Sequence, residues 1–190
     1  MRTATIERKT KETDISLSLN LDGGEVVINT GVGFFDHMLT AFATHAGYGL
    51  MVTCKGDIEV DCHHTVEDIG IVLGKALFEA LGDKSNIARY GSFFVPMDEA
   101  LGFCAVDICN RAYTVFEADF PQEKCGDFDA CMCVEFFRAV ADNAKITLHL
   151  RAPYGDNSHH IAEAIFKAFG HAMSIATEKK DKTLSTKGTL

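Results

Sequence analysis

Cys62-His63-His64-Thr65-Val66-Glu67-Asp68 is the stretch that decides the fold, because the chain repeats it. Ser158-His159-His160-Ile161-Ala162-Glu163 follows 96 residues later, and each copy stands between a strand-like run and an apolar helical pattern. Residues four apart share one face of a helix, so the first histidine of each copy and its glutamate can hold one ion. The second histidine is turned by about 100° and points elsewhere. Each copy therefore offers metal ligands in two directions.

The two copies belong to an internal duplication in which each half reads β-β-α-β-α. At an offset of 98, His45-Ala46-Gly47 falls opposite Asn143-Ala144-Lys145, and His37 falls opposite Glu135; the intervening loop absorbs the two-residue difference. Repeats of this kind are one structural unit used twice. We predict an α+β fold with helices packed on one face of each mostly antiparallel sheet. The halves are expected at residues 1–90 and 91–190, within one compact unit.

Apolar periodicity predicts the individual elements. In the first half we expect strands at 3–9, 13–21 and 25–30, the last returning after the Asp22-Gly23-Gly24 turn, then a helix at 34–45. A strand at 50–54 continues at 58–60, and a helix covers 65–81. The second half predicts strands at 92–95, 101–109, 112–118 and 146–150, with helices at 128–143 and 159–177. Composition alone predicts disorder in the polar tail from 178.

Composition limits the classes of function. The 190 residues are 47% apolar and 24% charged, and the net charge of −9 argues against a general nucleic-acid binder or a partner of anionic membranes. The seven cysteines form no CxxC pair, and the N-terminus is charged and polar. Reduced thiols in a cytoplasmic protein are therefore expected. The chain has no apolar run of 18 residues, which predicts that it does not span a membrane.

The duplication predicts two metal sites if the helices that carry the repeated motif are adjacent. One ion would take His63 and Glu67 together with His160, and the other would take His159 and Glu163 together with His64. The symmetric pair His37 and Glu135 would supply one further ligand apiece. Such mixed nitrogen and oxygen ligands suit Mn²⁺, Fe²⁺ or Zn²⁺.

Several nearby residues have competing interpretations. Asp68 lies four residues after His64, but its repeat equivalent is Ala164, so we expect a solvated or supporting carboxylate rather than a ligand. Cys62 matches Ser158 and predicts a small cap or packing residue. His45, two turns after His37, faces the same cavity or interacts with the helix dipole. His149 and His171 lie outside the pattern and are expected in core or surface roles.

Two arginines and the tail are candidates for anion binding. Arg89 and Arg111 flank the first strands of the second half, and arginine suits bidentate phosphate contact, although on sequence alone an ordinary surface role is favoured for each. Ser185-Thr186-Lys187-Gly188 combines hydroxyls, a cation and a flexible glycine. This segment either closes over an anion or is a frayed end.

At these residues the chain resembles the imidazoleglycerol-phosphate dehydratases of histidine biosynthesis. The resemblance covers essentially the whole chain in order and is carried by LNLDG (19–23), GFFDHML (33–39), HAG (45–47), HHTVEDIG (63–70), DEAL (98–101), VEFFRA (134–139), ITLHLR (146–151), NSHHIAEAIFKAF (157–169) and STKG (185–188). It implies a duplicated β-β-α-β-α fold, a di-manganese site shared between subunits, and an assembly of 24 chains.

The resemblance also implies the reaction and the residues that carry it. Imidazole glycerol phosphate would lose water to give imidazole acetol phosphate, through an imidazolate ring held by two Mn²⁺ ions. The implied metal ligands are His37, His63, His64, Glu67, Glu135, His159, His160 and Glu163. The implied substrate-binding residues are Glu12, His37, His45, His63, Glu67, Arg89, Arg111, Lys167, Ser185 and Lys187. We expect Glu12 to transfer the proton, with His45 as the alternative.

Three positions depart from the family pattern, and two other functions remain open. Several relatives have histidine at the position of Glu135, an acidic residue is common at Cys62, and the tail has Ser185-Thr186-Lys187 in place of SSK. A binuclear metallohydrolase is one alternative, although the aspartate-rich loops common in such sites are lacking. A non-catalytic metal-binding protein of the ferritin type is the other, but it would need four long helices with ExxH motifs.

Overall fold

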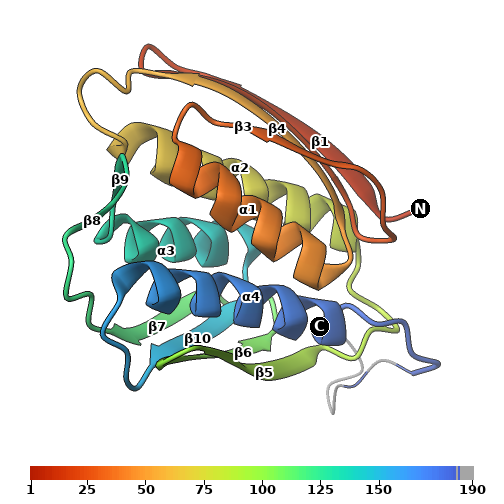
Figure 1. The fold of residues 1–190 in the computed structure, drawn as a ribbon. Helices are drawn as coiled ribbons and strands as arrows, with labels where there is room; N and C mark the ends of the chain where they lie inside the picture. The colour runs from red at the N-terminus through yellow and green to blue at the C-terminus, as the bar shows by residue number, and fades with distance from the viewer. Residues whose placement is uncertain (183, 185–190) are drawn as a thin grey trace.

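The computed structural model describes residues 1–182 and 184, and in them four helices lie between two four-stranded sheets (Figure 1). The elements of the first half are β1 (Thr3–Lys9), β2 (Thr13–Asn20), β3 (Val26–Asn29), α1 (Gly33–Ala46), β4 (Gly49–Gly56) and α2 (His63–Leu81). Those of the second half are β5 (Tyr90–Met97), β6 (Ala100–Asp107), β7 (Tyr113–Ala118), β8 (Lys124–Cys125), β9 (Phe128–Asp129), α3 (Met132–Ala144), β10 (Thr147–Ala152) and α4 (Ser158–Ala176).

The two sheets repeat one topology. Their strand orders are β1-β2-β4-β3 and β5-β6-β10-β7. In each, the first two strands form an antiparallel hairpin, the central pair is antiparallel, and the last strand joins in parallel. Alternate residues of β2 (Ile15, Leu17 and Leu19) are buried because this face lies on the helices. The α+β prediction and the repeated architecture are confirmed, with one parallel edge strand in each sheet.

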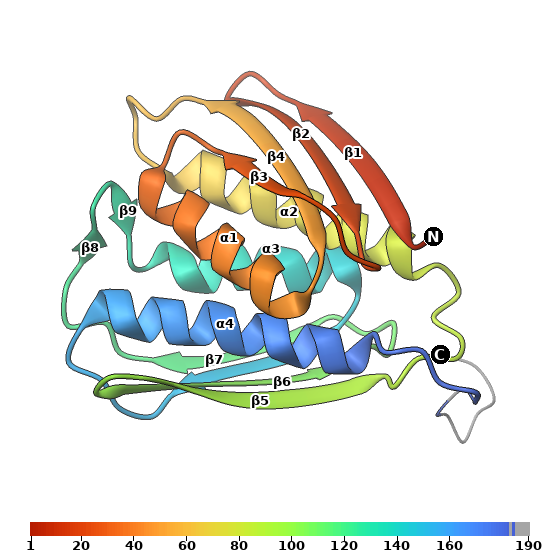
Figure 2. The same ribbon diagram turned by 45° about the vertical axis from the view of Figure 1, so that its right-hand side comes forward.

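The helices form the middle of the molecule. α1 and α2 cover the first sheet, α3 and α4 cover the second, and the two helical layers meet with α1 against α4 and α2 against α3 (Figure 2). Phenylalanines fill this junction: the rings of Phe42 in α1 and Phe169 in α4 stack with centroids 4.8 Å apart, and those of Phe35 in α1 and Phe136 in α3 meet edge to face at 5.3 Å. The stacked layers place residues from both halves next to one another.

Glycine allows the helical layers to approach closely. A Cβ on Gly170 of α4 would lie 2.6 Å from the carbonyl oxygen of Phe42 in α1. A Cβ on Gly74 of α2 would lie 2.6 Å from the carbonyl oxygen of Val140 in α3. These glycines are 96 residues apart, like the repeated histidines, so the duplication extends to the packing contact itself.

Three predicted elements are wrong in detail. Residues 25–30 do not return along the second strand, because β2 already has β1 and β4 on its two edges; β3 instead pairs in parallel with β4. Residues 58–60 form a turn rather than a strand. The helix expected from 128 begins at Met132, because the short β8–β9 hairpin precedes it.

The first part of the tail is ordered, contrary to the expectation from composition. Lys179 forms an antiparallel bridge with Ile87, and the amide of Lys180 donates to the carbonyl of Asn86 at 2.8 Å. Backbone hydrogen bonds therefore hold residues 178–180 beside the segment that leads into β5.

None of the helices in the described residues is long and apolar enough to cross a membrane. The boundary at residues 90 and 91 remains a prediction.

Candidate active site

α1 and α4 bring three of the predicted ligands together. Both Nε2 of His37 and Nε2 of His159 approach Oε2 of Glu163, at 3.4 Å and 3.2 Å. Their ligand atoms all lie within 4.8 Å of one another, and among the residues that the structure describes this is the one group of three with that property. The group borders a 560 Å³ cleft lined in part by Phe34, His37 and Lys124. Two imidazoles and a carboxylate at this spacing suit a divalent transition metal.

Glu163 is the charged centre of this group. Its side chain is 8% exposed, and Oε1 accepts a hydrogen bond from Nζ of Lys167 one turn later, at 2.7 Å. Burial raises the pKa of Glu163, but Lys167 and then His37 more than offset this effect, so the pKa lies below its ordinary value. Glu163 therefore presents an ionised carboxylate, the form that a cation requires.

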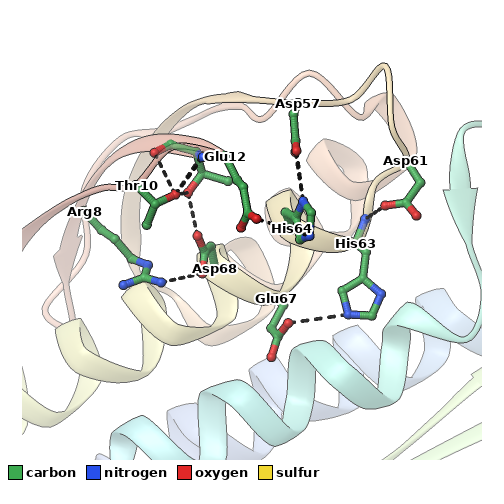
Figure 3. A network of polar contacts seen from close by, with 10 residues as sticks. Arg8, Thr10, Glu12, Asp57, Asp61, His63, His64, Glu67 and Asp68 are labelled. Atoms are coloured by element: carbon green, nitrogen blue, oxygen red, sulfur yellow. Dashed lines mark hydrogen bonds and ion pairs between the residues drawn. The ribbon is translucent and has the colours of Figure 1, made fainter.

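The corresponding residues of the first half are not assembled in the same way. Nε2 of His63 lies 3.5 Å from Oε2 of Glu67, and both side chains point to the α3 side of α2 (Figure 3). Glu135 on α3 instead accepts a hydrogen bond from Nη1 of Arg138, three residues later on the same helix, at 2.9 Å. These three residues therefore lie on the facing helices α2 and α3 without forming a compact group.

The second histidine of each motif points away from the first, as predicted, and is held by carboxylates. Nδ1 of His64 lies 3.0 Å from Asp57, and its Nε2 lies 3.8 Å from Glu12 (Figure 3). Nδ1 of His160 lies 2.8 Å from Glu99. The hydrogen bonds raise the pKa of both histidines, and His160 lowers that of Glu99 to about 2. A carboxylate on one ring nitrogen orients the imidazole and leaves the other free to bind metal.

The role of Asp57 and Glu99 was not predicted from the sequence. Asp57 directly follows β4, where a strand had been predicted to continue, so its position in a turn beside the motif was hidden. Glu99 lies in the DEAL segment; besides holding His160, its Oε1 accepts the amides of Asp156 and Asn157 at 3.2 Å and 3.0 Å. An acidic residue close to each adjacent-histidine motif was the available signal.

The supposition that the two motif helices are adjacent is wrong. The duplicated layers stack so that, among the helices of one chain, α2 packs mainly on α3 and α4 packs mainly on α1. Within one chain, neither His64 nor His160 joins the group formed by His37, His159 and Glu163. The crossing histidines therefore do not complete that group inside a single subunit.

Two residues beside the first motif have structural roles. Asp68 is buried, not solvated: its carboxylate binds Nη2 of Arg8 at 2.9 Å and Oγ1 of Thr13 at 2.5 Å. It thereby fastens α2 to β1 and β2, next to Glu12. Cys62 is also buried and makes no cap hydrogen bond, so packing rather than capping is its role; its Sγ accepts the amide of Asp129 at 3.5 Å.

The remaining predicted site residues lie on three further segments. His45, half-buried in the last turn of α1, has Nδ1 3.0 Å from Nε2 of His171, and burial lowers its pKa. Arg89 forms a two-pronged ion pair with Asp107, at 2.7 Å and 3.2 Å. Arg111 is exposed in the loop between β6 and β7. Ser185 and Lys187 lie outside the described residues.

Comparison with known proteins decides between the possible functions. The family model for imidazoleglycerol-phosphate dehydratase matches residues 30–173. The chain belongs to the imidazoleglycerol-phosphate dehydratase family. An imidazoleglycerol-phosphate dehydratase from Acetivibrio thermocellus is 58% identical over 97% of each chain, and one from Bacillus cereus strain B4264 is 57% identical over the whole of both.

Solved structures of imidazoleglycerol-phosphate dehydratases have the same fold. The crystal structure from Staphylococcus aureus matches with a TM-score of 0.86 at 43% identity, covering 94% of this chain and 99% of the other. The structure from Pyrococcus furiosus, in complex with (S)-C348, gives a TM-score of 0.86 at 38% identity, covering 97% and 100%. The chain is a hydro-lyase of histidine biosynthesis that converts imidazole glycerol phosphate to imidazole acetol phosphate. Its family is metal-dependent, and the His37, His159 and Glu163 group has the chemistry of a metal site.

Proposed function

We propose that each active site of this dehydratase uses two divalent cations, Mn²⁺ in the first instance, and is completed by residues of a neighbouring subunit. The observation that carries the proposal is that the two adjacent histidines of each motif point to different places. His159 joins His37 and Glu163, whereas the next residue, His160, is held away from them by Glu99. One chain therefore presents an incomplete ligand set together with a spare, oriented histidine.

The ligand sets follow from the duplication. One ion is held by His37, His159 and Glu163, with His64 supplied by a neighbour. The other is held by His63, Glu67 and Glu135, with His160 supplied by a neighbour. The donor atoms fit a cation of intermediate softness, since both sets combine imidazole nitrogen with carboxylate oxygen. Because Glu135 is paired with Arg138 in the chain, its carboxylate must exchange that ion pair for the metal.

A closed assembly of identical subunits would satisfy every incomplete set. Each ligand set of a chain lacks one histidine, and the same chain carries a spare histidine that can complete a set in a neighbour. Symmetric homo-oligomers with closed point groups bring such complementary surfaces together. We propose the assembly of 24 chains that the family resemblance implies, with all metal sites at contacts between subunits.

When bound, the cations would supply Lewis acidity that favours the deprotonated form of the imidazole ring and so assists the loss of water. The side chains of the protein then position the rest of the substrate. His37, His63 and Glu67 line the ring. Arg89, Arg111, Lys167, Ser185 and Lys187 supply donors for the phosphate, which provides binding energy remote from the reacting carbon.

Proton transfer is assigned to Glu12. Its carboxylate is exposed, beside Nε2 of His64 at 3.8 Å, and the amide of Glu12 donates to Oγ1 of Thr10 at 3.1 Å (Figure 3). Because Asp68 binds the neighbouring Thr13, the turn that carries Glu12 is held on α2. This turn therefore enters the active site together with His64. His45 is the alternative proton-transfer group.

Metal occupancy tests the ligand sets. His64→Ala and His159→Ala should each weaken the same one of the two ions, because both residues belong to one set. Crystals grown with Mn²⁺ and measured at the manganese absorption edge would show which site each variant loses. His149→Ala, an exposed histidine on β10, is the matched control and should keep both ions. Loss of both ions to the same extent in each ligand variant, or loss of different ions, would overturn the assignment.

A further inference from the structure

His171 has no part in the ligand sets, yet it continues the polar face of α4. Glu163, Lys167 and His171 follow His159 at intervals of four residues, so all four lie along one side of the helix. The imidazole of His171 packs flat on the ring of Phe93 from β5, with centroids 4.2 Å apart and planes inclined by 26°. Its Nε2 lies 3.0 Å from Nδ1 of His45, across the junction of α4 with α1.

We propose that His171 is a positioning residue that fixes the orientation of His45 and the location of its proton. The inference rests on the proposed role of His45 in binding substrate or moving a proton. A hydrogen bond between two imidazole nitrogens contains one proton, so the state of His171 determines whether Nδ1 of His45 donates or accepts. The other nitrogen of His45 points away from His171 and is left for the substrate.

The surroundings favour a fixed pair over a chance contact. Both histidines are half-buried, and their rings meet edge to face at 64° with centroids 4.8 Å apart. The stack on Phe93 limits rotation of the His171 ring. The close approach at Gly170, whose added Cβ would lie 3.1 Å from the Cβ of His45, sets the separation of the two helices at this level.

The pair is also specific to one half of the duplication. The glycine contact recurs, since Gly74 repeats Gly170, but the residues equivalent to His171 and His45 are Lys75 and Asn143. A feature required only for packing would be expected at both junctions. The imidazole pair instead occurs only where the helices also assemble His37, His159 and Glu163.

Steady-state kinetics with Mn²⁺ and imidazole glycerol phosphate test the proposal. His171→Phe keeps an aromatic ring on Phe93 but removes the hydrogen bond, and it should lower kcat/KM by roughly 3- to 10-fold, the range of a lost neutral hydrogen bond. His171→Gln, which can still donate or accept near Nδ1 of His45, should recover most of that loss. Metal content and thermal midpoint should stay at wild-type values, whereas a purely structural role would lower the midpoint and leave kcat/KM unchanged.

A double-mutant cycle shows whether His171 acts through His45. In a His45→Asn background, adding His171→Phe should change kcat/KM by less than about 2-fold. Equal losses in both backgrounds, or wild-type kcat/KM in His171→Phe, would overturn the proposal. Full activity in His45→Asn alone would instead show that the role proposed for His45 has failed.

Discussion

Replacing Gly170 with alanine should disturb the active site through the fold. The added Cβ would lie 2.6 Å from the carbonyl oxygen of Phe42 and 3.1 Å from the amide nitrogen of Ala46, both in the backbone of α1. Because backbone atoms cannot rotate away, the helices must separate by about 0.8 Å to reach an ordinary contact near 3.4 Å. Overpacking of this kind costs about 1–3 kcal/mol, and the better helix propensity of alanine returns up to about 1 kcal/mol.

The same movement would affect contacts that cross from α1 to α4. The hydrogen bond between His45 and His171 is 3.0 Å long, and a separation of this size would stretch it beyond hydrogen-bonding distance. The 3.4 Å approach of His37 to Glu163 would also lengthen. We therefore expect Gly170→Ala to lose about 1–2 kcal/mol of stability and to lower kcat/KM by about 10-fold or more.

Urea denaturation midpoints and steady-state kinetics at saturating Mn²⁺ would measure both effects. Gly74→Ala is the matched comparison, because its Cβ meets α3 at the same 2.6 Å but far from the imidazole pair. The two variants should lose similar stability, and only Gly170→Ala should uncouple His45 from His171, so that a further His171→Phe has no effect. Wild-type stability and kcat/KM in Gly170→Ala would refute the reasoning, since the helices would then accept the Cβ without moving.

Three further substitutions test polar interactions, two beside the site and one past the far end of α2 from His63. Asp68→Asn removes the charge that pairs with β1, and it should lower the urea midpoint by the equivalent of about 1.5–3 kcal/mol while reducing activity more than metal content. Lys84→Met keeps the apolar stem of a lysine that is 1% exposed but leaves Oδ1 of Asn110 without its donor, which should cost about 1–3 kcal/mol in the same assay. Glu99→Gln should destabilise the metal-free protein most between pH 4.5 and 6.5. The ionised Glu99, whose pKa is lowered, contributes stability that is fully present above pH 4.5 and is lost as the pH falls towards about 2. The protonated His160, whose pKa is raised, contributes stability that is fully present below pH 6.5 and is lost as the pH rises from 6.5 through its raised folded-state pKa. A pH-independent loss in urea midpoints would contradict the assigned ion pair.

Patterns of short period were enough to predict most of the elements and the pairing of side chains within each motif. The doubled motif placed His63 with Glu67 and His159 with Glu163, because spacing along a helix depends only on helix geometry. The pairing of β3 was mispredicted for a long-range reason: β1 and β4 already occupy both edges of β2. Local sequence does not record how many partners a strand has.

The junctions between helices were the other feature that the sequence did not determine. Adjacent motif helices would have been the simplest arrangement for two crossed sites, but the close-approach glycines place α1 on α4 and α2 on α3. For the same reason His171 was expected in an ordinary core or surface role. Its contact with His45 joins residues 126 positions apart, and only the packing of the two halves brings them together.

Coexpression of two inactive variants is the most direct test of sites completed by a neighbouring subunit. His64→Ala and His159→Ala each remove one ligand of the same proposed set, and differently tagged chains allow mixed oligomers to be purified. Mixed oligomers should regain dehydration of imidazole glycerol phosphate at about one site in four, because random mixing pairs an intact His64 with an intact His159 on a different chain at that frequency. Mixed oligomers as inactive as either variant alone would show that a single chain supplies both residues, and would contradict the shared site.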